Sequence, residues 1–391
     1  MRIGVDASCL ANGRGYGRFT QELLGALVAG APNDEFVLFC DSRAAAAWSS
    51  DRPNVSVVLV RQRKSPTLAA AAGGSRGVLD MLRFTRAVAR AHLDVFFSPS
   101  AYTYFPLPLG LPAVVTIHDA IADRFPQLTF PDARARMFWR AKIWLALKQA
   151  RIVLTVSEYA ARDIEAVYGV AKRQIRVATE APAPEYAPSE TCEQIRRVAA
   201  RFGLVSDDRW FIYVGGFNPH KHVDVIVRAH AAACAALVAP PHLVLVGTRE
   251  DDVFHSAGAR IDAAASSSPL SSRIHWTGFV PDCDLKHLLS GAIALVLPSE
   301  CEGFGLPAVE AAACGTPVIA TTASPLPELL EGGGIFVAPG NEQELISAMR
   351  TMLSDEGARR AMGDRALERS RVLSWNRTAD STLDALREAA A

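Results

Sequence analysis

Long apolar runs are missing from this sequence of 391 residues, although half of its residues are hydrophobic. No stretch reaches the roughly 18 apolar residues that a membrane-spanning helix requires. The first ten residues, MRIGVDASCL, are typical of a strand, because no basic segment leads into a long apolar one as in a secretory signal peptide. We therefore expect a cytoplasmic chain without a membrane span.

Cysteine pairs with metal-site spacing are missing as well. The seven cysteines include no C-x-x-C pair, and their odd number does not suit a disulfide framework. We expect free thiols in a reducing compartment rather than disulfides or a zinc ribbon.

An excess of charge of one sign is also lacking, since 41 Lys and Arg balance 41 Asp and Glu. The basic character of a nucleic-acid-binding chain is therefore absent, and no nucleic-acid partner is expected. The balance hides an asymmetry, because residues 1–180 carry 23 Lys and Arg against 15 Asp and Glu, which leaves 18 against 26. The first half either faces something anionic or has an uneven surface charge without a partner.

Short apolar runs alternate with helical patterns along the whole chain. This alternation predicts parallel sheets built from βαβ units. The Pro- and Ala-rich segment 180–190 resembles a linker, so we predict two Rossmann-like domains of similar size, 1–180 and 181–371. Helical patterns cover 16–30, 223–237 and 375–388, and 69–77 reads as a mobile loop. The predicted strands are 2–6, 36–40, 55–60, 94–98, 113–117, 152–156, 210–214, 242–247, 273–277, 292–297, 317–320 and 335–337.

The segment 301–320, CEGFGLPAVEAAACGTPVIA, places two glutamates around a glycine-rich turn. Glu302 lies in the loop after a predicted strand, and Glu310 in the first turns of a helix that opens at Pro307. Ligands of open α/β sheets bind at this edge. The amides of residues 303–305 suit a diphosphate, and carboxylates suit the hydroxyls of a ribose or another sugar. The alternative for Glu310 is compensation of the helix dipole.

The segment EGFGLPAVE, from Glu302 to Glu310, resembles the E-x7-E signature of retaining GT-B glycosyltransferases, especially family 4. The similarity spans nearly the whole chain, and its motifs are specific only as a set. It implies an α/β GT-B architecture, with two Rossmann-like β/α/β domains that face each other across a deep cleft. The first would bind the acceptor and the second the nucleotide-sugar, with a C-terminal helix, about 372–391, packed back on the first domain. The further similar segments are GYGRFTQELL (15–24), TIHDAIADRFP (116–126), TVSEYAARDI (155–164), YVGGFNPHKHVDVIVRAH (213–230), TGFVPDCDLKHLLSGAIALVLPS (277–299) and TTASPLPELL (321–330).

The resemblance also implies roles for single residues. Lys221 would neutralise the donor diphosphate, with His220 where the family often has Arg and no arginine near Gly215, where some members carry one. His220 could supply charge only if protonated. Phe279 and Val280 would lie against the base through their backbone, or simply pack. The predicted catalytic residues are His118, Lys221 and Glu302, and the predicted donor-binding residues are Gly15, Gly17, Gly216, His220, Lys221, Phe279, Val280, Glu302, Gly303, Phe304, Gly305, Leu306 and Glu310.

Two predictions concern the first domain. His118 ends a strand and would contact the transferred sugar, oriented by Asp119, unless it only caps the next turn. The loop ANGRGYGR (11–18) lacks the third glycine of G-x-G-x-x-G, and in the family it closes over the donor phosphate. Arg14 or Arg18 would then contact phosphate or remain on the surface.

No metal and no cofactor are expected. Asp282 and Asp284 match a D-x-D pattern, but they follow Pro281, where acidic residues commonly start a helix. His220 and His222 are two residues apart, which does not suit shared ligation of zinc.

The segment 131–150 combines five basic residues with Phe138, Trp139 and Trp144. Such a helix can lie on an anionic membrane surface, here the inner face of the cytoplasmic membrane. Packing of the aromatic side chains inward, with a solvated basic face, is the alternative.

The resemblance predicts a retaining, metal-independent transfer of a sugar, mannose from GDP-mannose being favoured and UDP-sugars open, to a glycan or lipid-linked glycan in cell-surface polysaccharide or glycolipid biosynthesis. Front-face attack is implied, with the diphosphate accepting the proton of the acceptor. A GT-B nucleotide-sugar epimerase and a non-catalytic sugar-nucleotide-binding module remain alternatives. A nicotinamide dehydrogenase is not favoured, because no ribose-binding acid follows Val60.

Overall fold

A computed structural model describes residues 1–13, 15–49, 52–63, 65–66, 77–205, 208–248 and 257–391. Arg14 and most of the predicted loop 69–77 lie outside the described residues. The chain forms two compact units, Met1–Glu180 with Ser374–Ala391, and Ala181–Leu373.

The first unit contains a seven-stranded sheet in the order β3-β2-β1-β4-β5-β6-β7, paired in parallel throughout the described residues. All strand predictions for this unit are confirmed within one or two residues. The strand β7 was missed, because its three residues, IRV, are too short to stand out as an apolar run. The strands are β1 (Arg2–Asp6), β2 (Glu35–Cys40), β3 (Val55–Leu59), β4 (Val95–Ser98), β5 (Ala113–Thr116), β6 (Ile152–Thr155) and β7 (Ile175–Val177).

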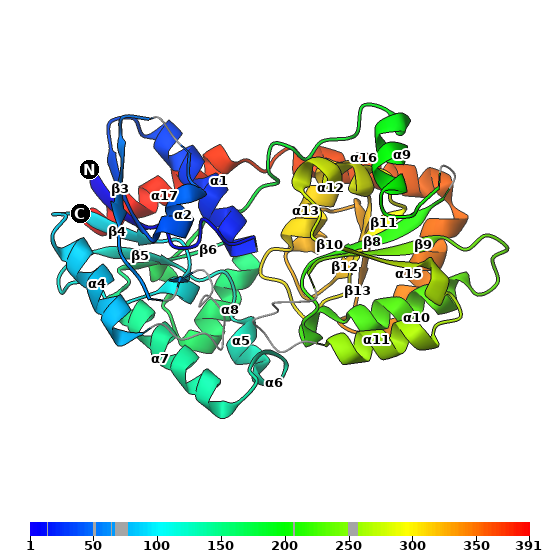
Figure 1. The fold of residues 1–391 in the computed structure, drawn as a ribbon, viewed down its shortest axis with the longest axis horizontal. Helices are drawn as coiled ribbons and strands as arrows, with labels where there is room; N and C mark the ends of the chain where they lie inside the picture. The colour runs from blue at the N-terminus through cyan, green and yellow to red at the C-terminus, as the bar shows by residue number, and fades with distance from the viewer. Residues whose placement is uncertain (14, 50–51, 64, 67–76, 206–207, 249–256) are drawn as a thin grey trace. The chain divides into compact units, whose positions relative to one another are not determined.

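Helices cover this sheet, and the C-terminal helix packs against the same unit as the N-terminal strand β1. The C-terminal helix α17 (Trp375–Ala390), red in Figure 1, lies beside α1 (Gly15–Gly30) and contacts β4, β5, β6 and β7. Its buried stripe includes Ala379, Leu383 and Leu386, spaced as the core face of a helix requires. The other helices are α2 (Ser42–Ala46), α4 (Val78–Ala89), α5 (Ile121–Arg124), α6 (Pro126–Thr129), α7 (Ala133–Gln149) and α8 (Glu158–Tyr168).

The second unit contains a six-stranded parallel sheet in the order β10-β9-β8-β11-β12-β13. All strand predictions for this unit are confirmed within one or two residues. The strands are β8 (Trp210–Val214), β9 (His242–Val246), β10 (Ile274–Gly278), β11 (Ala294–Leu297), β12 (Val318–Thr321) and β13 (Gly334–Val337).

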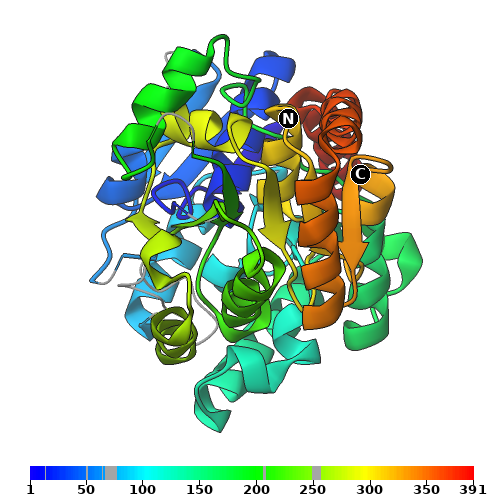
Figure 2. The same cartoon turned by 90° about the vertical axis from the view of Figure 1, so that its right-hand side faces the viewer.

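Helices α15 and α16, orange in Figure 2, pack against β13, and α15 also packs against α10. The helices of this unit are α9 (Cys192–Ala200), α10 (Val223–Cys234), α11 (Gly258–Ser267), α12 (Asp282–Ser290), α13 (Leu306–Ala313), α14 (Leu326–Leu329), α15 (Glu342–Ser354) and α16 (Glu356–Ser370).

Each sheet changes direction of winding once. This occurs between β1 and β4 in the first unit, and between β8 and β11 in the second. The loops after these strands splay apart at their carboxyl ends, and ligands of such sheets bind there. Lys221 follows β8 and Glu302 follows β11, so the topology brings these two predicted residues to one switch point.

Candidate functional site

Lys221 and Glu302 form an ion pair at the switch point of the second unit. Lys221 Nζ lies 2.6 Å from Glu302 Oε1, and their side chains are 19% and 10% exposed. The hydroxyl of Ser299 donates a hydrogen bond of 2.6 Å to the same oxygen, Oε1. The structure therefore joins two of the predicted catalytic residues and adds Ser299, which the sequence reasoning missed.

A second pair connects the same two loops. His222 Nε2 lies 2.9 Å from Glu300 Oε2, and the amide of Glu300 donates to the carbonyl of His220 at 2.7 Å. His222 has a φ of 53°, in the left-handed region that few residues other than glycine adopt. The ring of His222 thus contacts a carboxylate of the adjacent loop. The alternation of Glu300 and Glu302 in an irregular loop was the only sequence signal for this pair.

His220 lies beside Lys221 but adds no positive charge. Burial lowers the pKa of His220 well below its usual value, and the charges of Lys221 and His222 lower it further. The ring is therefore neutral at physiological pH. Lys221 is left as the cation of this turn.

The turn from Gly303 to Gly305 leads directly into α13. Gly305 has a φ of 89°, and a Cβ there would lie 2.7 Å from a methyl carbon of Leu326, so this position requires glycine. Phe304 and Leu306 are buried beside it. The amides of this turn lie before the positive end of the helix, where a diphosphate would be stabilised.

Glu310 lies in the first turns of α13, as the sequence predicted. It is the fifth of eight residues, within the second turn, and is only 4% exposed. A carboxylate there gains nothing from the positive end of the dipole, so dipole compensation does not explain it. Burial raises the pKa of the neighbouring Cys314 to about 12, and the charge of Glu310 contributes to this shift.

The residues predicted to face the base differ in their exposure. Phe279 is 69% exposed, whereas Val280 is 3% exposed and packs in the core. Plain packing therefore accounts for the side chain of Val280, and a role for Phe279 stays a prediction. Gly216, in the loop after β8, accepts a hydrogen bond from the hydroxyl of Tyr213 through its carbonyl.

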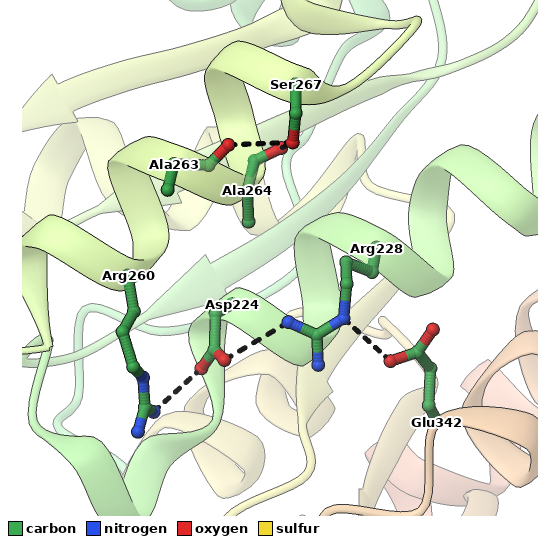
Figure 3. Close-up of polar contacts among 7 residues, drawn as sticks. All are labelled: Asp224, Arg228, Arg260, Ala263, Ala264, Ser267 and Glu342. Atoms are coloured by element: carbon green, nitrogen blue, oxygen red, sulfur yellow. Dashed lines mark hydrogen bonds and ion pairs between the residues drawn. The ribbon is translucent and has the colours of Figure 1, made fainter.

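A charged network fixes the helix that follows the lysine turn. Asp224, in the first turn of α10, binds Arg228 at 3.2 Å and Arg260 of α11 at 3.0 Å (Figure 3). Arg228 continues to Glu342 of α15 at 2.8 Å. Burial alone would raise the pKa of Asp224, but the hydrogen bonds and charges of the two arginines outweigh it and lower the pKa. The network ties the start of α10, and with it His222, to two neighbouring helices.

His118 follows β5 in the first unit, and both of its ring nitrogens face oxygen atoms. Nε2 lies 3.0 Å from the carbonyl oxygen of Pro99, and Nδ1 lies 3.6 Å from Oε1 of the buried Glu180. Phe19 packs edge-on against the ring, with 4.7 Å between the centroids. Glu180 had no signal in the sequence, because it lies in the predicted linker.

Asp119 caps the turn after β5. Its Oδ1 accepts the amide hydrogen of Ile121 at 2.9 Å. The alternative in which His118 caps this turn is therefore wrong.

Gly15 and Gly17 form the first turn of α1 rather than a loop. A Cβ on Gly17 would lie 1.9 Å from the carbonyl oxygen of Asn12, so the glycine lets the preceding loop pack on the helix. Contact of either glycine with a donor stays a prediction. Arg18 is half-buried, and Arg14 lies outside the described residues.

Both aspartates of the D-x-D pattern contact other side chains. Asp282 accepts a hydrogen bond from the hydroxyl of Tyr186 at 2.6 Å, and Asp284 binds Arg201 at 2.8 Å. Among the described residues, no group of three or more His, Cys, Asp or Glu is arranged to hold a metal ion.

The helix α7 within 131–150 divides its aromatic residues between core and surface. Trp139 is buried and donates from Nε1 to Asp123 at 2.8 Å. Met137, Phe138 and Trp144 are exposed. The part of the chain that the structure describes contains no helix long and apolar enough to cross a bilayer.

Two family models match most of the chain. Glycosyltransferase Family 4 matches residues 13–179, and Glycosyl transferases group 1 matches residues 195–369. The chain belongs to the family 4 glycosyltransferases. The predicted family and GT-B fold are thus confirmed.

Two relatives of this family 4 glycosyltransferase are mannosyltransferases of Escherichia coli. O-antigen chain mannosyltransferase B is 27% identical over 275 residues, which cover 70% of this chain and 69% of that protein. The serotype-specific mannosyltransferase WbdA is 26% identical over 273 residues, and the match spans only 33% of its length.

Solved structures show the same fold at lower identity. WaaG, a glycosyltransferase involved in lipopolysaccharide biosynthesis, superposes with a TM-score of 0.74 at 16% identity over 99% of both chains. Sucrose-phosphate synthase from Thermosynechococcus elongatus gives 0.75 at 20% identity, over 99% of this chain and 98% of that one. Anabaena Alr3699/HepE in complex with UDP-glucose gives 0.71 at 19% identity, over 98% of this chain and 99% of that one.

Proposed function

We propose that this family 4 glycosyltransferase moves a sugar from a nucleotide-sugar to a hydroxyl of a glycan or lipid-linked glycan, with retention of anomeric configuration. The observation that carries the proposal is the pair of Lys221 and Glu302, which lies at the switch point of the second unit beside the turn Gly303–Gly305. The second unit would hold the donor, and the first unit, with His118, the acceptor.

The proposed chemistry needs a group that stabilises a leaving diphosphate. The bond between the anomeric carbon and the phosphate oxygen breaks, and a bond from that carbon to the acceptor oxygen forms on the same face. The acceptor proton passes to the departing diphosphate. Lys221 and the amides before α13 would stabilise the developing charge, so we propose a reaction without a metal ion or another cofactor.

The pair also sets the order of events. Lys221 is bound to Glu302, so an arriving diphosphate would take the ammonium from that carboxylate. Glu302 can then accept a hydroxyl of the transferred sugar, while Ser299 holds its Oε1. Glu310, buried in the next helix, would accept the ribose hydroxyls.

We favour mannose as the transferred sugar, with GDP as its carrier. The support is the names of the two relatives, both mannosyltransferases at 26–27% identity. A solved structure of the same fold holds UDP-glucose, so UDP-sugars belong in every test of the donor.

We also propose that the protein docks peripherally on an anionic membrane surface through α7. The exposed Met137, Phe138 and Trp144 support this, together with the basic residues of the same helix. Such docking would suit a lipid-linked acceptor.

A thermal-shift panel tests the donor site first. GDP, UDP, ADP, dTDP and their sugars are compared with and without magnesium, since a ligand at about 100 times its Kd adds roughly 2.7 kcal/mol of stability. One nucleotide is expected to stabilise the protein without magnesium, and Glu310→Ala and Lys221→Ala to reduce both the shift and turnover strongly. Near-normal turnover in both variants contradicts the assignment.

The same assay separates the rival functions. An epimerase forms product without any acceptor, and a non-catalytic binding module binds the donor but releases no nucleotide. A glycosyltransferase releases the nucleotide faster when an acceptor is added.

A further inference from the structure

The chain passes between the two units twice, at Glu180–Ala181 and at Leu373–Ser374. Within the first unit, one crossing segment contacts His118, and the other contacts Phe19, whose ring packs against His118. No sequence motif pointed to this arrangement, because the residues that make it lie far apart in the chain.

The first crossing contacts His118 through a carboxylate. Glu180, the last residue of the first unit before the crossing, is 5% exposed, and its Oε1 lies 3.6 Å from Nδ1 of His118. That distance is an electrostatic contact rather than a short hydrogen bond. A carboxylate is rarely buried this far without a polar partner, and its partner here is the imidazole.

The second crossing reaches His118 through aromatic rings. Trp375, the first residue of α17, packs against Phe19 with 6.0 Å between the ring centroids, and Phe19 packs edge-on against His118. Thr378 of the same helix donates a hydrogen bond to the carbonyl of Thr179. This bond joins the second crossing to the residue directly before Glu180.

We propose that Glu180 is a positioning residue for His118. Its contact with the ring links the direction of the chain at the crossing to the orientation of the imidazole. The second link, between Nε2 and the carbonyl of Pro99, holds one nitrogen of the ring. Glu180 fixes the other nitrogen. A rotation of the backbone at 180–181 moves the carboxylate and releases the ring, so His118 takes its working orientation in only one arrangement of the crossing.

This inference rests on the proposed function, in which His118 belongs to the unit that binds the acceptor. It adds a residue that acts on turnover without touching the nucleotide, because the predicted diphosphate site belongs to the second unit. The two effects can therefore be separated kinetically.

Glu180→Gln tests the link, because the amide keeps the size of the side chain and removes its charge. The probe is whichever of GDP-mannose and UDP-glucose stabilises the protein, and the readout is release of the nucleoside diphosphate. We expect kcat to fall about tenfold or more, with the donor KM and the Kd of the nucleoside diphosphate within about twofold of wild type. Glu185→Gln, an exposed carboxylate in the same segment, is the matched control and should leave all three values unchanged.

A double-mutant cycle with His118→Ala identifies the route. If Glu180 acts through His118, the double variant is as slow as His118→Ala alone. Additive losses, or full kcat in Glu180→Gln while His118→Ala is slow, overturn the proposal. Should Glu180→Gln fail to fold, Glu180→Asp draws the carboxylate back and is expected to give the same pattern.

A readout independent of turnover keeps the two proposals apart. The ¹H–¹⁵N signals of the His118 ring, assigned by their loss in His118→Ala, should shift in Glu180→Gln and stay in place in Glu185→Gln. A wild-type protein that releases no nucleotide counts against the proposed function alone. Unmoved ring signals count against the link between Glu180 and His118.

Discussion

In the proposed function, Glu302 and the donor diphosphate would compete for one ammonium group, that of Lys221. The carboxylate holds Nζ at 2.6 Å. Replacing it with an amide removes the competing charge but keeps the size of the side chain. We expect Glu302→Gln to bind free nucleoside diphosphate tighter, by roughly threefold to tenfold, and to turn over the nucleotide-sugar at least about 100-fold more slowly.

Calorimetry with the nucleoside diphosphate and a nucleotide-release assay measure the two effects on the same preparation. Glu331→Gln, an exposed carboxylate of the same unit, serves as the control. Weaker binding of the diphosphate by Glu302→Gln would mean that the carboxylate orients Lys221 for the phosphate instead of competing with it.

His222 has a left-handed backbone conformation and a side-chain contact with Glu300, and two substitutions separate these two features. Asn tolerates a positive φ, so His222→Asn removes the contact with Glu300 and leaves the turn unstrained. His222→Val adds the strain of a β-branched residue, about 1–3 kcal/mol. We expect His222→Asn to lower kcat/KM several-fold with little change in Tm, and His222→Val to lower Tm by roughly 3–10 °C as well. Equal Tm values in the two variants would show that the left-handed turn costs nothing here.

At the scale of an element, α17 completes the core of a unit that the rest of the chain leaves unfinished. Leu386 is fully buried on the face that packs against α1 and the sheet. Leu386→Ala should cost about 2–5 kcal/mol, which corresponds to a Tm of the first unit lower by roughly 5–15 °C. Asp384→Ala, on the exposed face of the same helix, should stay within about 0.5 kcal/mol of wild type. Calorimetry of the two variants measures this difference in stability. A small loss of unfolding free energy for Leu386→Ala would mean that α17 contributes little to the stability of the unit.

The exposed face of α7 should control membrane binding if the protein docks there. Phe138→Ser with Trp144→Ser removes two large apolar side chains from solvent without touching the buried Trp139. We expect binding to vesicles with anionic lipid to fall about tenfold or more, and wild-type binding to weaken with added salt. Val238→Ser, an exposed apolar residue of the second unit, is the control in the same sedimentation assay. Equal binding by wild type and the double variant would exclude α7 as the docking helix.

The elements were more predictable than the contacts between them. Buried parallel strands appear in the sequence as short apolar runs, so all strands of the described residues except β7 could be located. Lys221 and Glu302 could be assigned to one site from the family resemblance, and the structure places their loops after the adjacent strands β8 and β11. Glu180, Ser299 and Glu300 could not, because their significance depends on partners that only the folded chain supplies. The start of α13 was predicted at Pro307 and lies at Leu306, which is within the ordinary uncertainty of a helix boundary.

At the scale of the whole molecule, histidines with lowered pKa gather in the second unit. They are His220, His230, His242, His275 and His287. Burial is the first cause for each, and for His230 it lowers the pKa to about 4. His242 accepts a hydrogen bond from Arg273 at Nε2, and its Nδ1 lies 2.6 Å from Nε2 of His275, an arrangement of neutral rings.

Acidification should therefore destabilise the second unit before the acidic groups of the protein titrate. A histidine whose folded pKa is lowered stays neutral in the fold, whereas the unfolded chain takes up its proton below about pH 6.5. Each such group removes about 1.4 kcal/mol of unfolding free energy per pH unit until its folded pKa is reached. The loss starts near pH 6.5 and accumulates toward pH 4, since Asp208 beside His242 opposes only part of it.

Hydrogen exchange resolved by peptide measures this loss unit by unit. Between pH 7.5 and pH 5, after correction for the intrinsic rate, protection should fall in β8, β9 and α10, which surround His230 and His242. Replacing the fully buried His230 by Gln removes one of the titrating groups and should make the decline shallower, even if stability at pH 7.5 is lower. A slope that His230→Gln leaves unchanged would assign the acid sensitivity to carboxylates such as Asp224, whose pKa is lowered and whose contribution to stability is lost only at lower pH.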